Sequence, residues 1–185
     1  MKIIILFGSH RIGGTNSEIE RMIKELPINH QFDFIHMADY KVESCNSCEK
    51  CSQNKRCILP VTDNDHFQEI YDKFIEADAI IIITPVYAGL PSRLTALFER
   101  MTSVLFFSGL MNTDNNPLLN KKVGIFNYCS SGICDDSNIK ILFQKFVMKN
   151  YSFNQLDYNY LNHYKDPNYI YGSLKEYIKQ TILNL

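Results

Sequence analysis

The sequence predicts an α/β fold in which helices cover both faces of a doubly wound, five-stranded parallel sheet. Unbroken apolar runs over residues 2–7 and 79–84 are typical of strands that are buried on both faces. Segments whose apolar residues recur at helical spacing separate these runs. Because the links between the two kinds of segment are short, we expect right-handed crossovers between parallel strands.

The elements follow one another in a regular order. A helix over 15–26, capped by Thr15, Asn16 or Ser17, follows the first strand, and a second strand covers 32–37. After a polar, irregular segment come a helix capped by Thr62 or Asp63, the strand over 79–84, and a helix after Pro91. The expected remainder is a strand over 122–127, a helix around 136–149, a strand within 152–158 and a helix over 173–183. Five such strands predict the flavodoxin-like order 2-1-3-4-5, with a ligand at the carboxyl ends of strands one and three.

Length and composition indicate one domain over residues 1–185, with residues 40–62 as an inserted cysteine-rich loop. Hydrophobic residues make up 45% of the chain and the net charge is −1, so we expect neither nucleic acid nor a membrane as partner. No signal peptide or spanning segment is recognisable. We therefore expect a cytoplasmic protein, where clustered cysteines favour metal or redox roles over disulfides.

The first loop, Gly8–Ser17, has the composition of a phosphate site. Glycines let a phosphate approach the backbone, and the following helix directs its N–H groups toward an anion. It is neither a Walker A loop nor G-x-G-x-x-G, which argues against nucleoside triphosphate and dinucleotide binding. An ordinary βα turn is the alternative. The candidate residues are Ser9, Arg11, Gly14, Thr15, Asn16 and Ser17.

A second loop follows the strand over 79–84 and consists of Pro85, Val86, Tyr87, Ala88 and Gly89. Gly89 lets the backbone lie close to a planar ligand, and a ring bound here could stack on Tyr87. Alternatively, Tyr87 only fills the end of the sheet.

Four cysteines, Cys45, Cys48, Cys51 and Cys57, have the spacing C-x2-C-x2-C-x5-C. Such runs of thiolates are typical ligands of a [4Fe–4S] cluster. A structural zinc site more often uses two separated pairs, and thiols without metal are the third alternative. Three basic residues in the loop, Lys50, Lys55 and Arg56, either offset the charge of a cluster or are solvated. Cys129 and Cys134 are expected to be buried thiols that could replace a ligand.

The motifs Gly8-Ser9-x-Arg11, Gly14-Thr15-Asn16 and Pro85-Val86-Tyr87-x-Gly89 resemble the NADPH-dependent FMN reductase superfamily, and the cysteine insertion resembles its iron–sulfur flavoprotein branch. The resemblance implies that the first loop wraps the FMN phosphate and the second lies along the isoalloxazine ring. It also implies that the loop after the fourth strand, with Ser130 and Gly132, borders the flavin.

The expected function is therefore an FMN-dependent electron-transfer oxidoreductase with a [4Fe–4S] cluster and no catalytic acid–base residue. The alternatives are an NAD(P)H-dependent FMN or quinone reductase without a cluster, and a non-enzymatic redox or metal sensor. The resemblance implies a ferredoxin-like carrier or NAD(P)H as donor, a small-molecule acceptor, and a homodimer or homotetramer. Surplus apolar residues over 104–107 and the segment 158–171 are the expected contact surface, unless Phe106 and Phe107 pack under the 108–120 loop.

Overall fold

The computed structural model describes residues 1–59, 65–87, 89–129, 137–162 and 169–185. Its sheet consists of β1 (Lys2–Phe7), β2 (Gln31–His36), β3 (Ala79–Pro85), β4 (Lys122–Cys129) and β5 (Asn154–Asn162). The strand order is β2-β1-β3-β4-β5 and all four pairings are parallel. The predicted fold class and strand order are confirmed.

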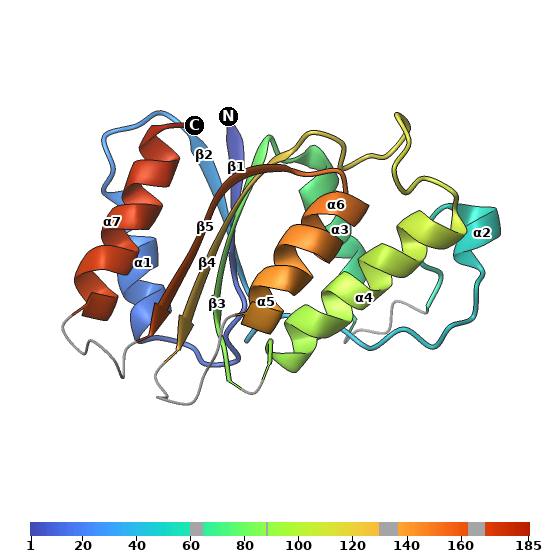
Figure 1. The fold of residues 1–185 in the computed structure, drawn as a ribbon, viewed down its shortest axis with the longest axis horizontal. Helices are drawn as coiled ribbons and strands as arrows, with labels where there is room; N and C mark the ends of the chain where they lie inside the picture. Colours follow the sequence, from blue (N-terminus) through green and yellow to red (C-terminus); the bar gives the residue numbers. More distant parts are fainter. Residues whose placement is uncertain (60–64, 88, 130–136, 163–168) are drawn as a thin grey trace.

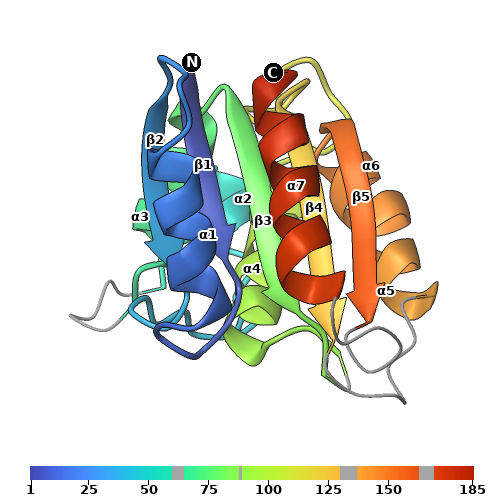
Figure 2. The same cartoon turned by 90° about the vertical axis from the view of Figure 1, so that its left-hand side faces the viewer.

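Helices cover both faces of this sheet (Figures 1 and 2). On one face, α1 (Thr15–Lys24) and α7 (Tyr169–Leu183) pack through Ile19, Ile23 and Ile178. The other face carries α3 (Phe67–Glu76), α4 (Ser92–Phe107) and a last helical stretch. That stretch comprises α5 (Ser137–Ile141), the π-helical turn η1 (Leu142–Val147) and α6 (Met148–Asn150).

The strands and α4 follow from the local sequence. β-Branched isoleucines fill β1 and β3, which suits strands that are buried on both faces. The helix α4 ends where the Ser108 hydroxyl donates to the carbonyl of Val104 and where Gly109, with a φ of 68°, allows a left-handed turn.

Three local predictions were wrong. The N-cap of α1 is Gly14, not a hydroxyl or amide residue, and it makes no side-chain cap hydrogen bond. The helix α3 begins at Phe67, later than a cap at Thr62 or Asp63 requires, because the Asp65 carboxylate accepts from the Phe67 amide. Thr62 and Asp63 themselves lie outside the described residues. Finally, the cysteine-rich loop is not wholly irregular, since it contains the one-turn helix α2 (Cys51–Asn54).

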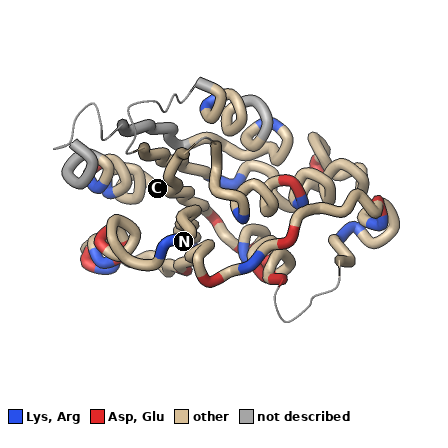
Figure 3. Tube along the Cα trace, turned by 90° about the horizontal axis from the view of Figure 1, so that it is seen from below, with Lys and Arg blue, Asp and Glu red and all other residues tan. Residues whose placement is uncertain are grey.

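Charged residues of both signs are interspersed along the trace (Figure 3). Within the described part of the chain, every helix is too short or too polar to cross a membrane.

Candidate functional site

The phosphate loop lies at the carboxyl end of β1, where the strand approaches β3 closely. The Gly8 amide donates to the Ile83 carbonyl at 2.8 Å. A Cβ on Gly8 would lie 2.5 Å from Oγ1 of Thr84, so only glycine fits there. The loop then turns through Gly13 and Gly14, whose φ angles of 88° and 60° favour glycine. This tight approach places the start of α1 at the carboxyl edge of the sheet.

The N-cap residue of α1, Gly14, makes no side-chain hydrogen bond to the backbone donors of the first turn, which leaves these donors available to a ligand. Ser9 is buried, and its hydroxyl accepts from the Arg11 amide at 3.0 Å. Thr15 is half-buried, whereas Arg11 and Ser17 are exposed. Helix amides, hydroxyls and one cation therefore surround a place where an anion can bind.

His10 belongs to the same loop. Its Nε2 accepts from the Arg93 amide at 3.4 Å. Partial burial, and then the Arg93 charge, lower the pKa of His10, which favours the neutral ring. The Arg93 guanidinium itself donates to the carbonyls of Met37 and Ala38, each at 2.7 Å, and so holds the chain that leaves β2.

The second loop leaves β3 with its backbone held by hydrogen bonds and with Tyr87 about half exposed. Val86 is buried, and its amide donates to the Tyr128 carbonyl of β4 at 2.8 Å. The Tyr87 amide donates to the Gly89 carbonyl at 3.1 Å, while the Tyr87 side chain is 53% exposed. The expectation that Tyr87 merely fills the sheet end does not fit this exposure.

Two buried amides at this edge have polar atoms without partners. Asn127 on β4 is fully buried, and neither its Oδ1 nor its Nδ2 has a hydrogen-bond partner among the described residues. Asn16 on α1 is buried, and within the described part of the chain its Oδ1 has no partner. Because such groups are rarely left unpaired, they fit a polar ligand at the carboxyl edge of the sheet. Ala88, Ser130 and Gly132, the other predicted flavin contacts, lie outside the described residues.

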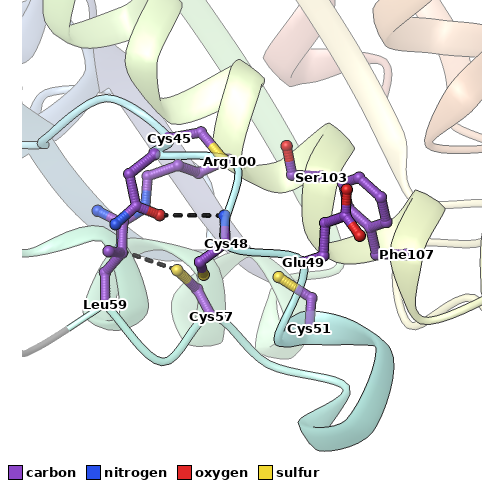
Figure 4. A pocket seen from close by; sticks show the side chains of 10 residues that line it. Cys45, Cys48, Glu49, Cys51, Cys57, Leu59, Arg100, Ser103 and Phe107 are labelled. Carbon is purple, nitrogen blue, oxygen red and sulfur yellow. Dashed lines mark hydrogen bonds between the residues drawn. The ribbon is translucent and has the colours of Figure 1, made fainter.

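The segment that carries the four cysteines, here called the cysteine segment, runs from the carboxyl end of β2 along α4 to α2 (Figure 1). Cys45, Cys48, Cys51 and Cys57 are free thiols that line one pocket together with residues of α4 (Figure 4). Each gap between successive cysteines contains one residue with positive φ, namely Ser47, Glu49 and Lys55. These left-handed turns reverse the backbone and keep the four side chains on the same pocket.

Hydrogen bonds hold the two ends of this segment. The Glu99 carboxylate accepts from the Cys45 amide at 3.2 Å. The Arg100 guanidinium donates from Nη2 to Sγ of Cys57 at 3.1 Å. The Ser47 amide points to Sγ of Cys45 at 3.4 Å. N–H groups thus face two of the four sulfurs, as they commonly do around iron–sulfur clusters.

Burial and the neighbouring cysteines affect the thiol chemistry. Cys51 is buried, and desolvation first, followed by the charges of Cys57 and Cys48, raises the pKa of its thiol. Metal ligation requires the thiolate, so bound iron would relieve this repulsion.

The donor set fits a cluster better than it fits a single ion. Among the described residues, no three Cys, His, Asp or Glu side chains converge closely enough to hold one metal ion. The space between the thiols is about 10 Å³, roughly room for one water. Four free thiols with N–H groups directed at sulfur match the ligands of a cubane.

The other basic residues and cysteines named in the sequence analysis do not line the cysteine pocket in the described part of the chain. Lys50, Lys55 and Arg56 are exposed and do not line the pocket, and Arg56 pairs with Asp72 at 2.9 Å. They are a solvated surface. Cys129 is buried and does not line the cysteine pocket, and Cys134 lies outside the described residues.

The sequence prediction did not include Glu99, Arg100 or Asp65. Arg100 is 2% exposed and sits within the apolar stripe of α4, between Leu97 and Met101. A charged residue at an inward position of an amphipathic helix is the signal that could have found it. Nothing in the sequence pattern indicates its partner Asp65.

The fold and these two loops define a flavodoxin-like protein with a ligand site at the carboxyl edge of its parallel sheet. Residues 1–147 match the NADPH-dependent FMN reductase family, and the chain belongs to that family.

Two relatives are named iron–sulfur flavoprotein. The one from Methanosarcina thermophila is 33% identical over 124 residues, which are 65% of this chain and 59% of that protein. The one from Archaeoglobus fulgidus is 30% identical over 90 residues, 48% of this chain and 42% of that protein. The chain thus spans about half the length of these relatives.

A similar solved structure is general stress protein 14 from Treponema denticola in complex with FMN. Its TM-score is 0.60 at 11% identity, with 98% of both chains covered. At this identity the likeness concerns the fold.

Proposed function

We propose that the protein is an electron-transfer oxidoreductase that passes electrons between FMN, a [4Fe–4S] cluster and an external carrier or acceptor. The observation that carries the proposal is the convergence of Cys45, Cys48, Cys51 and Cys57 on one pocket in an FMN reductase chain. The names of the relatives support it. When bound, FMN exchanges electrons singly or in pairs and the cluster exchanges them singly.

The residues of the chain bind and orient the flavin in this proposal. The amides of α1, the Ser9 hydroxyl and Arg11 bind the phosphate, and Tyr87 flanks the ring at the end of β3. Asn127 and Asn16 offer buried polar atoms to the rest of the ligand. The proposal assigns no residue as a general acid or base.

The two proposed sites lie apart along α4. The flavin loop precedes Ser92, whereas the cysteine pocket contacts α4 at Arg100, which is about 12 Å further along the helix axis. We therefore propose a homodimer or homotetramer in which a second copy shortens the electron path. Phe106 on α4 is 63% exposed and is a candidate contact, whereas Phe107 is partly buried and packs against the core.

The donor and the acceptor are also part of the proposal. A ferredoxin-like carrier or NAD(P)H supplies electrons and a small molecule accepts them. We place the protein in the cytoplasm, where the four thiols stay reduced and available to iron.

A specific observation favours a second candidate, an NAD(P)H-dependent FMN or quinone reductase without a cluster. The narrow space between the thiols and the absence of a convergent ligand triad among the described residues are what cysteines without metal would show.

An optical spectrum of anaerobically purified protein separates the two candidates. A broad absorption at about 400 nm that lies beneath the flavin bands and is bleached by dithionite supports the cluster. Flavin bands alone, with full reduction by NADPH, support the plain reductase. Chromatography of the heat-released flavin checks the cofactor, and FAD as the main species would contradict an FMN site.

A further inference from the structure

We propose that Arg100 is a positioning residue that holds Sγ of Cys57 and raises the reduction potential of the cluster. The inference rests on the proposed function, because it requires the four cysteines to hold that cluster. It concerns a residue of α4 that lies outside the cysteine segment.

Contacts on several sides fix the guanidinium of Arg100. Its Nη1 donates to both carboxylate oxygens of Asp65, at 2.7 and 2.6 Å, and to the Glu43 carbonyl at 3.3 Å. The ring of Phe67 lies 4.2 Å from its central carbon. Its Nη2 then points to Sγ of Cys57 at 3.1 Å. The direction of this last donor is therefore set before any cluster binds.

Arginine suits this geometry better than lysine. Its planar fork offers separate N–H groups to the carboxylate and to the sulfur, whereas an ammonium on a flexible stem cannot hold both in fixed directions. Stability alone does not explain the pair, because well-packed apolar residues commonly replace a buried ion pair without loss. Nε of Arg100 is also buried without an acceptor in the described part of the chain, which further weakens a purely stabilising role.

The chemistry gives the direction of the effect. Hydrogen bonds to the sulfurs and local charge set the potential of an iron–sulfur cluster, and an N–H donor favours the more negative, reduced state. Because Asp65 neutralises Arg100, the N–H dipole is the main influence that reaches Cys57. Loss of this donor should lower the potential, and loss of the Asp65 charge should raise it.

The experiment compares wild type with Arg100→Lys, Asp65→Asn and Arg56→Lys. Each protein is purified anaerobically, its iron and sulfide are measured, and the cluster is titrated by EPR at controlled potentials. Arg100→Lys keeps the charge and removes the fork. At the same applied potential, this variant should have a reduced-to-oxidised ratio roughly tenfold lower than that of wild type. This corresponds to a fall in the reduction potential of about 59 mV for one electron. Asp65→Asn should shift the ratio in the opposite direction.

Arg56→Lys is the matched control, since Arg56 lies in the same loop but pairs with Asp72 outside the pocket. Its potential should equal that of wild type. Equal potentials for wild type and Arg100→Lys, with full iron in both, would overturn the inference and leave the proposed function intact. Should Arg100→Lys not fold, Asp65→Asn decides: an upward shift supports the inference and an unchanged potential overturns it. Wild type without iron and sulfide would overturn the proposed function, and this inference with it.

Discussion

Arg100 donates a hydrogen bond to Sγ of Cys57 across 3.1 Å, although 43 residues separate the two along the chain. The preceding residue, Glu99, accepts from the Cys45 amide. Consecutive residues of α4 therefore contact both ends of the cysteine segment. Since the same helix begins just after the flavin loop, α4 links the two candidate cofactor sites.

The close approach of β1 to β3 makes Gly8 intolerant of a side chain. Gly8→Ala should lower the free energy of unfolding by about 1–3 kcal/mol, because the new Cβ would lie 2.5 Å from Oγ1 of Thr84. Urea denaturation of the flavin-free protein measures this. In Gly89→Ala the new Cβ meets no described atom within 4 Å, so stability should stay within about 0.5 kcal/mol of wild type. Equal stability of Gly8→Ala and wild type would refute the close approach.

Arg11 tests the phosphate loop without disturbing the fold, because its side chain is exposed. Arg11→Ala should weaken FMN binding by roughly tenfold through the loss of a charge-assisted hydrogen bond. Flavin fluorescence, followed as FMN is titrated into the flavin-free protein, gives the affinity. Arg21→Ala, an exposed change further along α1, should bind FMN as wild type does. An unchanged affinity for Arg11→Ala would remove this residue from the site.

Cys51 should react slowly with alkylating agents in the metal-free protein. Burial, and then the neighbouring cysteines, raise the pKa of its thiol, so less thiolate is present at any given pH. A pH series of iodoacetamide labelling, read by mass spectrometry, should place the midpoint for Cys51 above that of the same cysteine in urea-unfolded protein. Coincident midpoints in folded and unfolded protein would contradict the raised pKa.

Phe106 tests the proposed assembly. Wild type should scatter light as at least a dimer at micromolar concentration, and Phe106→Glu should shift the mass toward the 21.5 kDa monomer. The matched control, Leu183→Glu, lies on α7 across the sheet and should leave the mass unchanged. Wild type that scatters as a monomer would exclude a stable dimer.

The sequence predicted the sheet and its order well because the inner strands β1 and β3 each bury a continuous apolar run, and such a run is a local pattern. The four cysteines were also visible, since their spacing is a local pattern. The ion pair between Arg100 and Asp65 could not be predicted from the sequence, because only the packing of α3 against α4 brings these residues together. The capping prediction for α1 failed because Gly14 takes the cap position and leaves the helix amides available.

Quantitation of iron, sulfide and flavin in anaerobically purified protein tests the central claim most directly. The proposal predicts about four iron and four sulfide for each FMN. Single changes of Cys45, Cys48, Cys51 or Cys57 to Ala should each remove most of the iron while FMN remains bound. Flavin without iron or sulfide in wild type, or full iron in all four variants, would contradict the account.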